Sequence, residues 1–298
     1  MKKIITFLLF VFVVQICYAK GIGTTMFQIL HLPQSAYDAS LANTTGAGEV
    51  SAISNPSIIP FLKTSIAFTH AIYIEDTKYS VGNVNVMLNK NSGLNFGFCY
   101  FDYGTMDKFL EYGDGYIKDG TFSSNDKVFN ISYGTKIYKS FYSGLSLKYI
   151  SQKIDDVSYS GYSATLSGLV FFNKSTFCSF GLNNFGSSIK DYDLPTSLFC
   201  SLSSEIDETT LAVVQINDYY NDELCEFKIA TEKSFDENFF IRLGYVVPTK
   251  NYGGSNNSFI TNLTLGAGLK FKKFFIDYAW LPKGDLGNIN MFTLRVNF

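Results

Sequence analysis

Residues 259–271 read FITNLTLGAGLKF, and their hydropathy alternates with a period of two. Because successive side chains of a β-strand point to opposite faces, this alternation predicts a strand with one apolar face. Its 13 residues are long for a strand of a soluble protein, which usually has about 5–6. A tilted strand that crosses a membrane needs about 9–11, so the length favours a membrane strand. The odd-numbered face consists of Phe259, Thr261, Leu263, Leu265, Ala267, Leu269 and Phe271.

The same alternation recurs in three further stretches, at residues 129–137, 141–149 and 239–247. In each of them the second face is small or polar but rarely charged. A soluble β-sandwich would carry charge on its outer face, whereas a membrane barrel turns apolar side chains to lipid and small or polar ones to its lumen. The pattern therefore predicts a transmembrane β-barrel.

Fourteen strands are predicted between residue 65 and the C-terminus, and bacterial single-chain barrels have an even number of strands. The short connections, such as Lys139–Ser140 and Lys272, fall after every second strand, and the longer ones lie at the other end, the longest being a predicted loop at 103–126. Outer-membrane barrels sort their turns and loops in this way. The fold class is thus predicted as an all-β, 14-stranded antiparallel outer-membrane β-barrel. The predicted strands are 65–74, 78–88, 93–102, 127–138, 141–152, 158–172, 175–184, 196–204, 208–217, 224–233, 238–247, 259–271, 273–281 and 289–298.

The composition agrees with a barrel. Charged residues make up 17% of the 298 residues, against about 25% in soluble proteins, and aromatic residues also make up 17%. The mean hydropathy is only +0.08, which excludes a bundle of membrane helices. The net charge of −2 gives no bulk attraction for nucleic acid.

The N-terminus predicts an export signal at residues 1–19. Lys2 and Lys3 precede an apolar run at Ile4–Ile16, and Cys17-Tyr18-Ala19 supplies small residues at a cleavage site. A buried helix and a lipidated Cys17 are the alternatives. Residues 20–63 do not alternate and are predicted as a plug segment with a short helix near 35–42, with a disordered linker as the alternative. The barrel domain is predicted at 64–298.

The chain ends on an alternating strand whose last residue is Phe298. A terminal aromatic residue of this kind resembles the signal read by the outer-membrane barrel assembly machinery, which is therefore a predicted partner together with outer-membrane lipid. The mature chain keeps Cys99, Cys178, Cys200 and Cys225, each within an apolar run. They are interpreted as small apolar residues, and a bridge between Cys178 and Cys200 is left open.

An ordered series of short motifs resembles the PorV/PorQ family of outer-membrane barrels, and the resemblance covers about residues 25–298. The motifs are Ala42 with Asn55-Pro56-Ser57, Phe101-Asp102-Tyr103-Gly104, Gly144–Ile150 with Lys153-Ile154, Asn183-Asn184-Phe185-Gly186 with Leu194-Pro195, and Gly266–Leu269 followed by Asp277-Tyr278-Ala279 and Gly284–Asn288.

The resemblance implies a barrel similar to the long-chain fatty-acid transporters, with fourteen strands and an N-terminal plug. Some members of the family serve type IX secretion, where they bind cargo proteins and meet subunits of the secretion machinery. The resemblance thus implies a component of protein secretion. A transporter of hydrophobic small molecules is the alternative.

Arg242 and Arg295 are the only two arginines, and both fall on the polar, lumen-facing register of their strands. A salt bridge to a carboxylate of the plug is predicted for them, with Glu49 as the suggested partner. A clamp for the carboxylate of a ligand is the alternative, since a guanidinium binds carboxylates in a bidentate manner.

Asp102, Tyr103 and Gly104 end a predicted strand at the start of the longest predicted loop. Asp102 is suggested to fix the entry of this extracellular loop, and an ordinary Asx turn is the alternative.

No residue pattern predicts catalysis, a cofactor or a metal. The two histidines, His31 and His70, have no acidic or cysteine cluster beside them in the sequence, and no nucleotide-binding or hydrolase motif is present. A lipid-modifying enzyme is therefore disfavoured, and the sequence predicts a non-enzymatic barrel.

Overall fold

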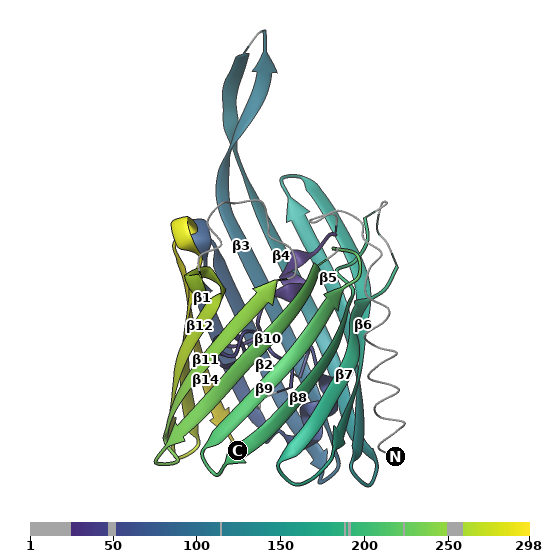
Figure 1. The fold of residues 1–298 in the computed structure, drawn as a ribbon. Coiled ribbons are helices and arrows are strands. Elements are labelled where there is room, and N and C mark those ends of the chain that lie inside the picture. Colours follow the sequence, from purple (N-terminus) through teal and green to yellow (C-terminus); the bar gives the residue numbers. More distant parts are fainter. Residues whose placement is uncertain are drawn as a thin grey trace.

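The computed structural model describes residues 25–46, 52–113, 115–187, 189, 192–222, 224–248 and 259–298. Within them, fourteen strands close into one antiparallel barrel (Figure 1). The strands are β1 (Ser65–Ile72), β2 (Lys78–Asn89), β3 (Ser92–Tyr112), β4 (Gly115–Tyr138), β5 (Phe141–Ile154), β6 (Val157–Phe171), β7 (Thr176–Phe185), β8 (Ser197–Asp207), β9 (Thr210–Tyr219), β10 (Leu224–Phe235), β11 (Phe239–Pro248), β12 (Leu263–Phe271), β13 (Phe274–Pro282) and β14 (Asn288–Asn297). Each strand pairs with its neighbours in the chain, and β1 pairs with β14. The predicted fold class is confirmed.

The helices of the described residues are all short. They are η1 (Gln28–His31), α2 (Ala36–Ser40), η2 (Pro56–Phe61), η3 (Ile74–Asp76), η4 (Phe259–Asn262) and η5 (Gly284–Leu286). Among these, none has the length and apolar character that a membrane-spanning helix needs.

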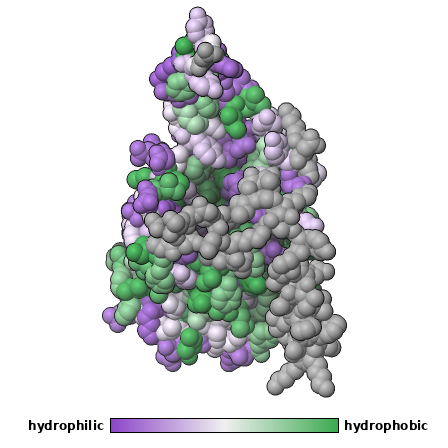
Figure 2. Space-filling model, turned by 45° about the horizontal axis from the view of Figure 1, so that its top comes forward, coloured by the Kyte–Doolittle hydropathy of each residue, from purple (hydrophilic) through white to green (hydrophobic). Residues whose placement is uncertain are grey.

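The two faces of the strands follow the alternation of the sequence. On β11 the side chain of Ile241 is 45% exposed on the outside, whereas that of Arg242 next to it is 3% exposed inside the barrel. On the side shown in Figure 2, hydrophobic side chains gather on the wall of the barrel and hydrophilic ones lie toward its two rims. This is the distribution expected of a barrel with lipid around its middle.

The predicted loop at 103–126 is wrong, because β3 and β4 continue through it. Their ladder runs from Ser92 opposite Thr135 to Tyr112 opposite Gly115, with register shifts near Asp102 and Asp107. The outer part of this hairpin projects beyond the rim of the barrel (Figure 1). Strands outside the bilayer need no apolar face toward lipid, so the alternation that reveals a membrane strand is lost while the backbone pairing continues.

The stretch at 259–271 is only partly a strand. β12 begins at Leu263, and the four residues before it form η4. The ring of Phe259 stacks on that of Tyr245 at the end of β11, with 4.8 Å between the ring centroids. The apolar side chain of Phe259 is therefore turned toward a neighbouring ring at the rim instead of continuing the ladder.

Residues 25–46 and 52–63, called the inner segment here, lie inside the barrel. Backbone amides of the segment donate to inward-pointing side chains of β14, β9 and β6 (Ala36 to Thr293, Thr45 to Gln215 and Ser57 to Ser167), at 2.8–2.9 Å. The segment thus touches the wall on several sides. Glu49 and the predicted signal peptide at 1–19 lie outside the described residues.

Local sequence explains how the inner segment folds. The hydroxyl of Ser35 accepts a hydrogen bond from the amide of Asp38 and caps α2. Pro56 opens η2, where its missing amide proton costs nothing. Gly144 on β5 allows close approach, since a Cβ there would lie 2.3 Å from the carbonyl carbon of Pro56.

Candidate functional site

Arg242 lies on the inner face of β11, and among the described residues two carboxylates of the barrel wall bind it. Its Nε donates to Glu232 on β10 at 2.5 Å, and its Nη1 donates to Asp277 on β13 at 2.6 Å. The guanidinium also lies 4.2 Å from the ring centroid of Tyr37 on α2. The inner segment therefore contacts Arg242 through the aromatic ring of Tyr37.

Arg295 on β14 is buried as well, and its guanidinium carbon lies 4.3 Å from the ring centroid of Phe275. Neither arginine lines the pocket described below.

Asp102, Tyr103 and Gly104 mark the point where the projecting hairpin leaves the barrel. The carboxylate of Asp102 accepts a hydrogen bond from the amide of Gly104 at 2.9 Å, and Gly104 has a φ of 75°. The hydroxyl of Tyr103 donates to Asp126 on β4 at 3.0 Å. The three residues form a β-bulge with an Asx turn, a device that re-aims a strand without interrupting it.

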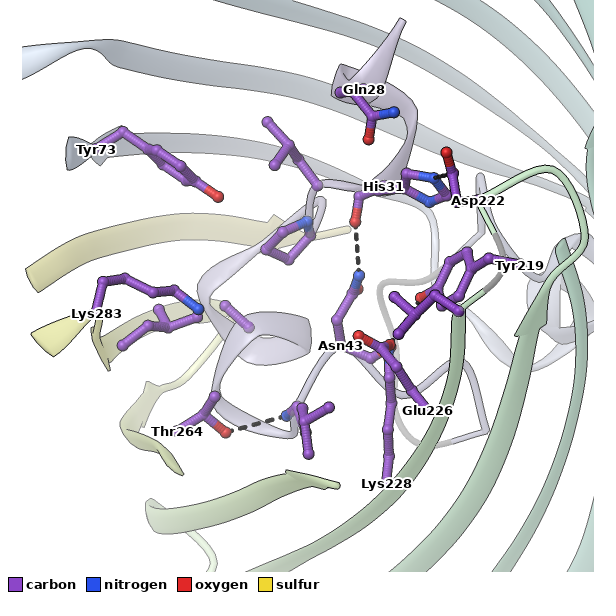
Figure 3. A pocket seen from close by; sticks show the side chains of 17 residues that line it. Gln28, His31, Asn43, Tyr73, Tyr219, Asp222, Glu226, Lys228, Thr264 and Lys283 are labelled. Atoms are coloured by element: carbon purple, nitrogen blue, oxygen red, sulfur yellow. Dashed lines mark hydrogen bonds and ion pairs between the residues drawn. The ribbon is translucent and has the colours of Figure 1, made fainter. Parts of the chain in front are cut away.

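A pocket of roughly 380 Å³ lies between the inner segment and strands β9 to β13, at the end of the barrel where the longer connections lie (Figure 3). Its inner side is formed by η1, α2 and the residues that follow them, up to Asn43. Its outer side is formed by β9 to β13 and by Tyr73 after β1. The volume falls within the range of about 300–1,000 Å³ typical of small-molecule sites.

Asp222, between β9 and β10, ties the inner segment to one side of this pocket. Its carboxylate accepts a hydrogen bond from the hydroxyl of Thr25 at 2.7 Å and lies 3.3 Å from Nε2 of His31. Burial favours the neutral acid, but the hydrogen bonds from His31 and Thr25 outweigh it and hold the pKa of Asp222 below its usual value. The ring of His31 also meets Tyr219 edge to face, with 4.8 Å between centroids.

A second polar contact lies below the first. The ammonium of Lys228 is 3.2 Å from the carboxylate of Glu226 and donates to the backbone carbonyl of Asn43 at 3.4 Å. The hydroxyl of Tyr219 donates to Glu226 at 2.9 Å. The buried charges of this side are thus paired, as burial requires.

The opposite side is formed by Lys283 and Tyr73 (Figure 3). Burial lowers the pKa of Lys283, and the carboxylate of Glu226 opposes that shift. The lining also includes the apolar side chains of Leu32, Pro33, Leu224, Val246 and Leu281.

Sequence reasoning missed this pocket. It found no acidic partner for His31, because Asp222 is 191 positions away in the chain. His70 lies elsewhere, on β1, with its Nδ1 3.0 Å from the hydroxyl of Ser80. In the described part of the chain, no three histidine, cysteine, aspartate or glutamate side chains form a group that could hold a metal ion.

The thiols of Cys99, Cys178 and Cys200 are not joined in a disulfide. The sulfurs of Cys178 and Cys200 lie 3.9 Å apart on adjacent strands.

No family model matches the chain, and no curated protein matches its sequence. Solved structures do resemble it. The ΔS2S3 mutant of the TodX monoaromatic hydrocarbon channel superposes with a TM-score of 0.65 at 12% identity, over 89% of this chain and 99% of that one. The CymD monoaromatic hydrocarbon channel gives 0.64 at 10% identity, over 89% and 98%.

A FadL homologue from Pseudomonas aeruginosa gives 0.58 at 10% identity, over 90% of this chain and 98% of that one. At this identity the likeness shows the fold alone: the chain has the barrel fold of hydrocarbon channels and FadL-like proteins.

Proposed function

We propose that this protein is a non-enzymatic outer-membrane barrel that binds hydrophobic small molecules in the pocket between the inner segment and strands β9 to β13. The observation that carries the proposal is the pocket itself, a cavity of roughly 380 Å³ inside the barrel whose lining combines apolar side chains with polar ones. The fold shared with hydrocarbon channels supports it. Outer-membrane lipid surrounds the exposed apolar side chains of the wall.

The pocket suits a molecule that is mostly apolar. Each Å² of apolar ligand surface that leaves water contributes about 25 cal/mol to the binding free energy. The side chains of Leu32, Val246 and Leu281 are the apolar groups of the pocket that cover this ligand surface. The polar groups at the two sides are Lys283 and the Glu226–Lys228 pair, which orient a polar substituent. Passage past the inner segment then requires that its contacts with the wall open and close again.

A binding measurement with a matched pair of variants tests the proposal. Val246 lines the pocket, and Val247 beside it points outward and is exposed. Toluene and palmitate titrated into the purified full-length barrel should bind saturably. Val246→Trp should raise the Kd of whichever ligand binds more tightly at least about tenfold. Val247→Trp should bind as the wild type does. Absence of saturable binding, or unchanged binding by Val246→Trp, would contradict the proposal.

A second candidate function is that of the PorV/PorQ family, in which the barrel binds cargo of type IX secretion and subunits of its machinery. The observation that favours it is the projecting β3–β4 hairpin, which exposes Phe109, Leu110 and Ile117 and leaves 77% of Tyr116 open to solvent. Exposed apolar groups of this kind on a two-stranded ribbon mark surfaces for protein contact.

Capture with a tagged barrel distinguishes the two functions. Proteins that carry the type IX C-terminal domain should copurify with the wild type and be lost when residues 105–122 are deleted. A bound fraction that contains small hydrophobic molecules but none of these cargo proteins would refute the secretion function. Absence of type IX translocon genes from the same genome would also refute it.

A further inference from the structure

A second cavity, of roughly 220 Å³, lies at the opposite end of the barrel, where the short turns are. It is formed below η2 of the inner segment by the lower ends of β6, β7 and β8. Its lining is apolar except at the rim, where Lys174, Ser175 and Glu205 stand. The apolar lining consists of Ile58, Phe61, Leu62, Leu169, Phe171 and Phe177.

An open cluster of aromatic rings forms one side of this cavity. The ring of Phe61 lies 5.3 Å from that of Phe171 and 4.6 Å from that of Tyr142, in tilted orientations. Phe171 in turn lies 5.2 Å from Phe177. Tilted rings at 4.5–7 Å are favourable pairs. A further ring that enters the cavity would extend the cluster.

Phe61 is unusual among the residues that the inner segment contributes to this cavity. Its side chain remains 42% exposed, whereas Ile58 and Leu62 beside it are buried. The exposed part of Phe61 borders a concave apolar space, so water there is in contact with hydrocarbon on several sides. A ligand that displaces this water removes its own apolar surface and that of the cavity from water, and both contributions favour binding.

We propose that this cavity is a second binding site, specific for a neutral molecule with a single aromatic ring. An apolar protein cavity of about 150 Å³ is large enough to bind benzene, so roughly 220 Å³ admits one ring with a short substituent. The charged side chains of Lys174 and Glu205 stand at the rim, where a polar substituent meets water. A long acyl chain exceeds the space.

The inference rests on the proposed function and adds the order in which a ligand occupies the two sites. The pocket between the inner segment and β9 to β13, now called the upper pocket, is lined by inner-segment residues 28–43. The second cavity, now called the lower cavity, is lined by residues 58–62 of the same segment. The two sites therefore lie one after the other along the barrel, on opposite sides of the segment. A ring that has passed the segment occupies the lower cavity before it leaves through the end with the short turns.

Crystals of the full-length barrel soaked with iodobenzene test this, since the anomalous signal of iodine locates each site separately. The wild type should show iodine in both cavities. Leu169→Trp should fill the lower cavity and lose only that peak. Leu166→Trp, on the same strand but exposed on the outer face, should keep both peaks.

A variant that keeps the fold supports the measurement in solution. Phe61→Glu places a charge on a side chain that is already partly exposed, and it should weaken binding of toluene at one of the two sites at least about tenfold. Phe61→Tyr should retain it.

The outcomes separate the two proposals. Iodine in the upper pocket alone would overturn the second site and leave the proposed function standing. Iodine in the lower cavity alone would support the second site and contradict the upper pocket. Iodine in neither, together with no saturable binding in solution, would overturn both.

Discussion

Arg242 on β11 and Asp277 on β13 form an ion pair across the strand that lies between them, with 2.6 Å from Nη1 to Oδ1. The pair passes over Gly268 on β12, where a Cβ would lie 2.7 Å from Asp277 Oδ1 and 2.7 Å from Arg242 Nη2. Glu232 on β10 holds the other edge of the guanidinium. One arginine thus links β10, β11 and β13 across the intervening β12.

Gly268→Ala should destabilise the barrel because the added methyl group meets both charged side chains. Overpacking of this kind costs about 1–3 kcal/mol, and it should appear as a lower midpoint of urea unfolding in detergent. The matched control is Gly82→Ala on β2, where a Cβ would have no atom within 4 Å. Equal losses in the two variants would contradict the role given to Gly268.

Arg242→Met should leave the buried carboxylate of Asp277 and the half-buried carboxylate of Glu232 without their shared cation. Removal of one partner from a buried ion pair costs about 3–5 kcal/mol, measured again by urea unfolding. Because Arg242 does not line the upper pocket, toluene should bind to the folded variant with unchanged affinity. Lost binding in a variant of normal stability would instead indicate a ligand clamp.

Asp222 should make the barrel less stable in acid. Its pKa is lower in the folded protein than its usual value, about 3.9 in an unfolded chain. The stabilisation is complete above the unfolded pKa and is lost as the pH falls through the lower, folded pKa. The difference in unfolding free energy between the wild type and Asp222→Asn should therefore shrink as the pH falls below about pH 4.

Thr25→Val gives the control for this pH dependence. It removes the hydroxyl that donates to Asp222 at 2.7 Å and keeps the contact with His31. The loss of stability should still begin near the unfolded pKa, but it should be smaller and be complete at a higher pH than in the wild type. A pH profile identical to that of the wild type would show that the hydroxyl does not depress the pKa.

Phe298→Ala should reduce the amount of assembled barrel in cells without changing its stability. The side chain of Phe298 is 71% exposed, so the folded state loses little when it is removed. Its amide still donates to the carbonyl of Thr64. Normal unfolding of the purified variant with a lowered outer-membrane level would support a signal for the assembly machinery, and a normal level would contradict it.

The sequence was sufficient for the fold wherever lipid and lumen impose opposite demands on neighbouring residues. Ile241 and Arg242 reveal their faces by chemistry alone. The projecting part of β3 and β4 could not be recognised in the same way, because both of its faces meet water. The ends of strands were also hidden, as at Phe259, where an aromatic contact at the rim replaces strand pairing.

The candidate site was beyond sequence reasoning for a different reason. His31 and Asp222 come together only because the inner segment lies inside the closed barrel. Lys283 joins them from a third part of the chain. No local spacing encodes such a meeting. The arginines carried a local signal, their position on the polar register, but nothing in the local sequence pointed to Glu232 and Asp277 as the carboxylates that Arg242 binds.

The pairing of β1 with β14 has a consequence for the order of folding. The hydroxyls of Thr69 and Thr293 meet across this seam from positions 224 residues apart, a contact of very high sequence separation and therefore slow to form. The inner segment directly precedes β1 and ends up enclosed. We therefore expect the inner segment to pack onto the partly formed sheet before β1 pairs with β14. Early docking of the segment then sets the rate at which the barrel closes. Variants that weaken this docking should lengthen the lifetime of an open, protease-sensitive intermediate.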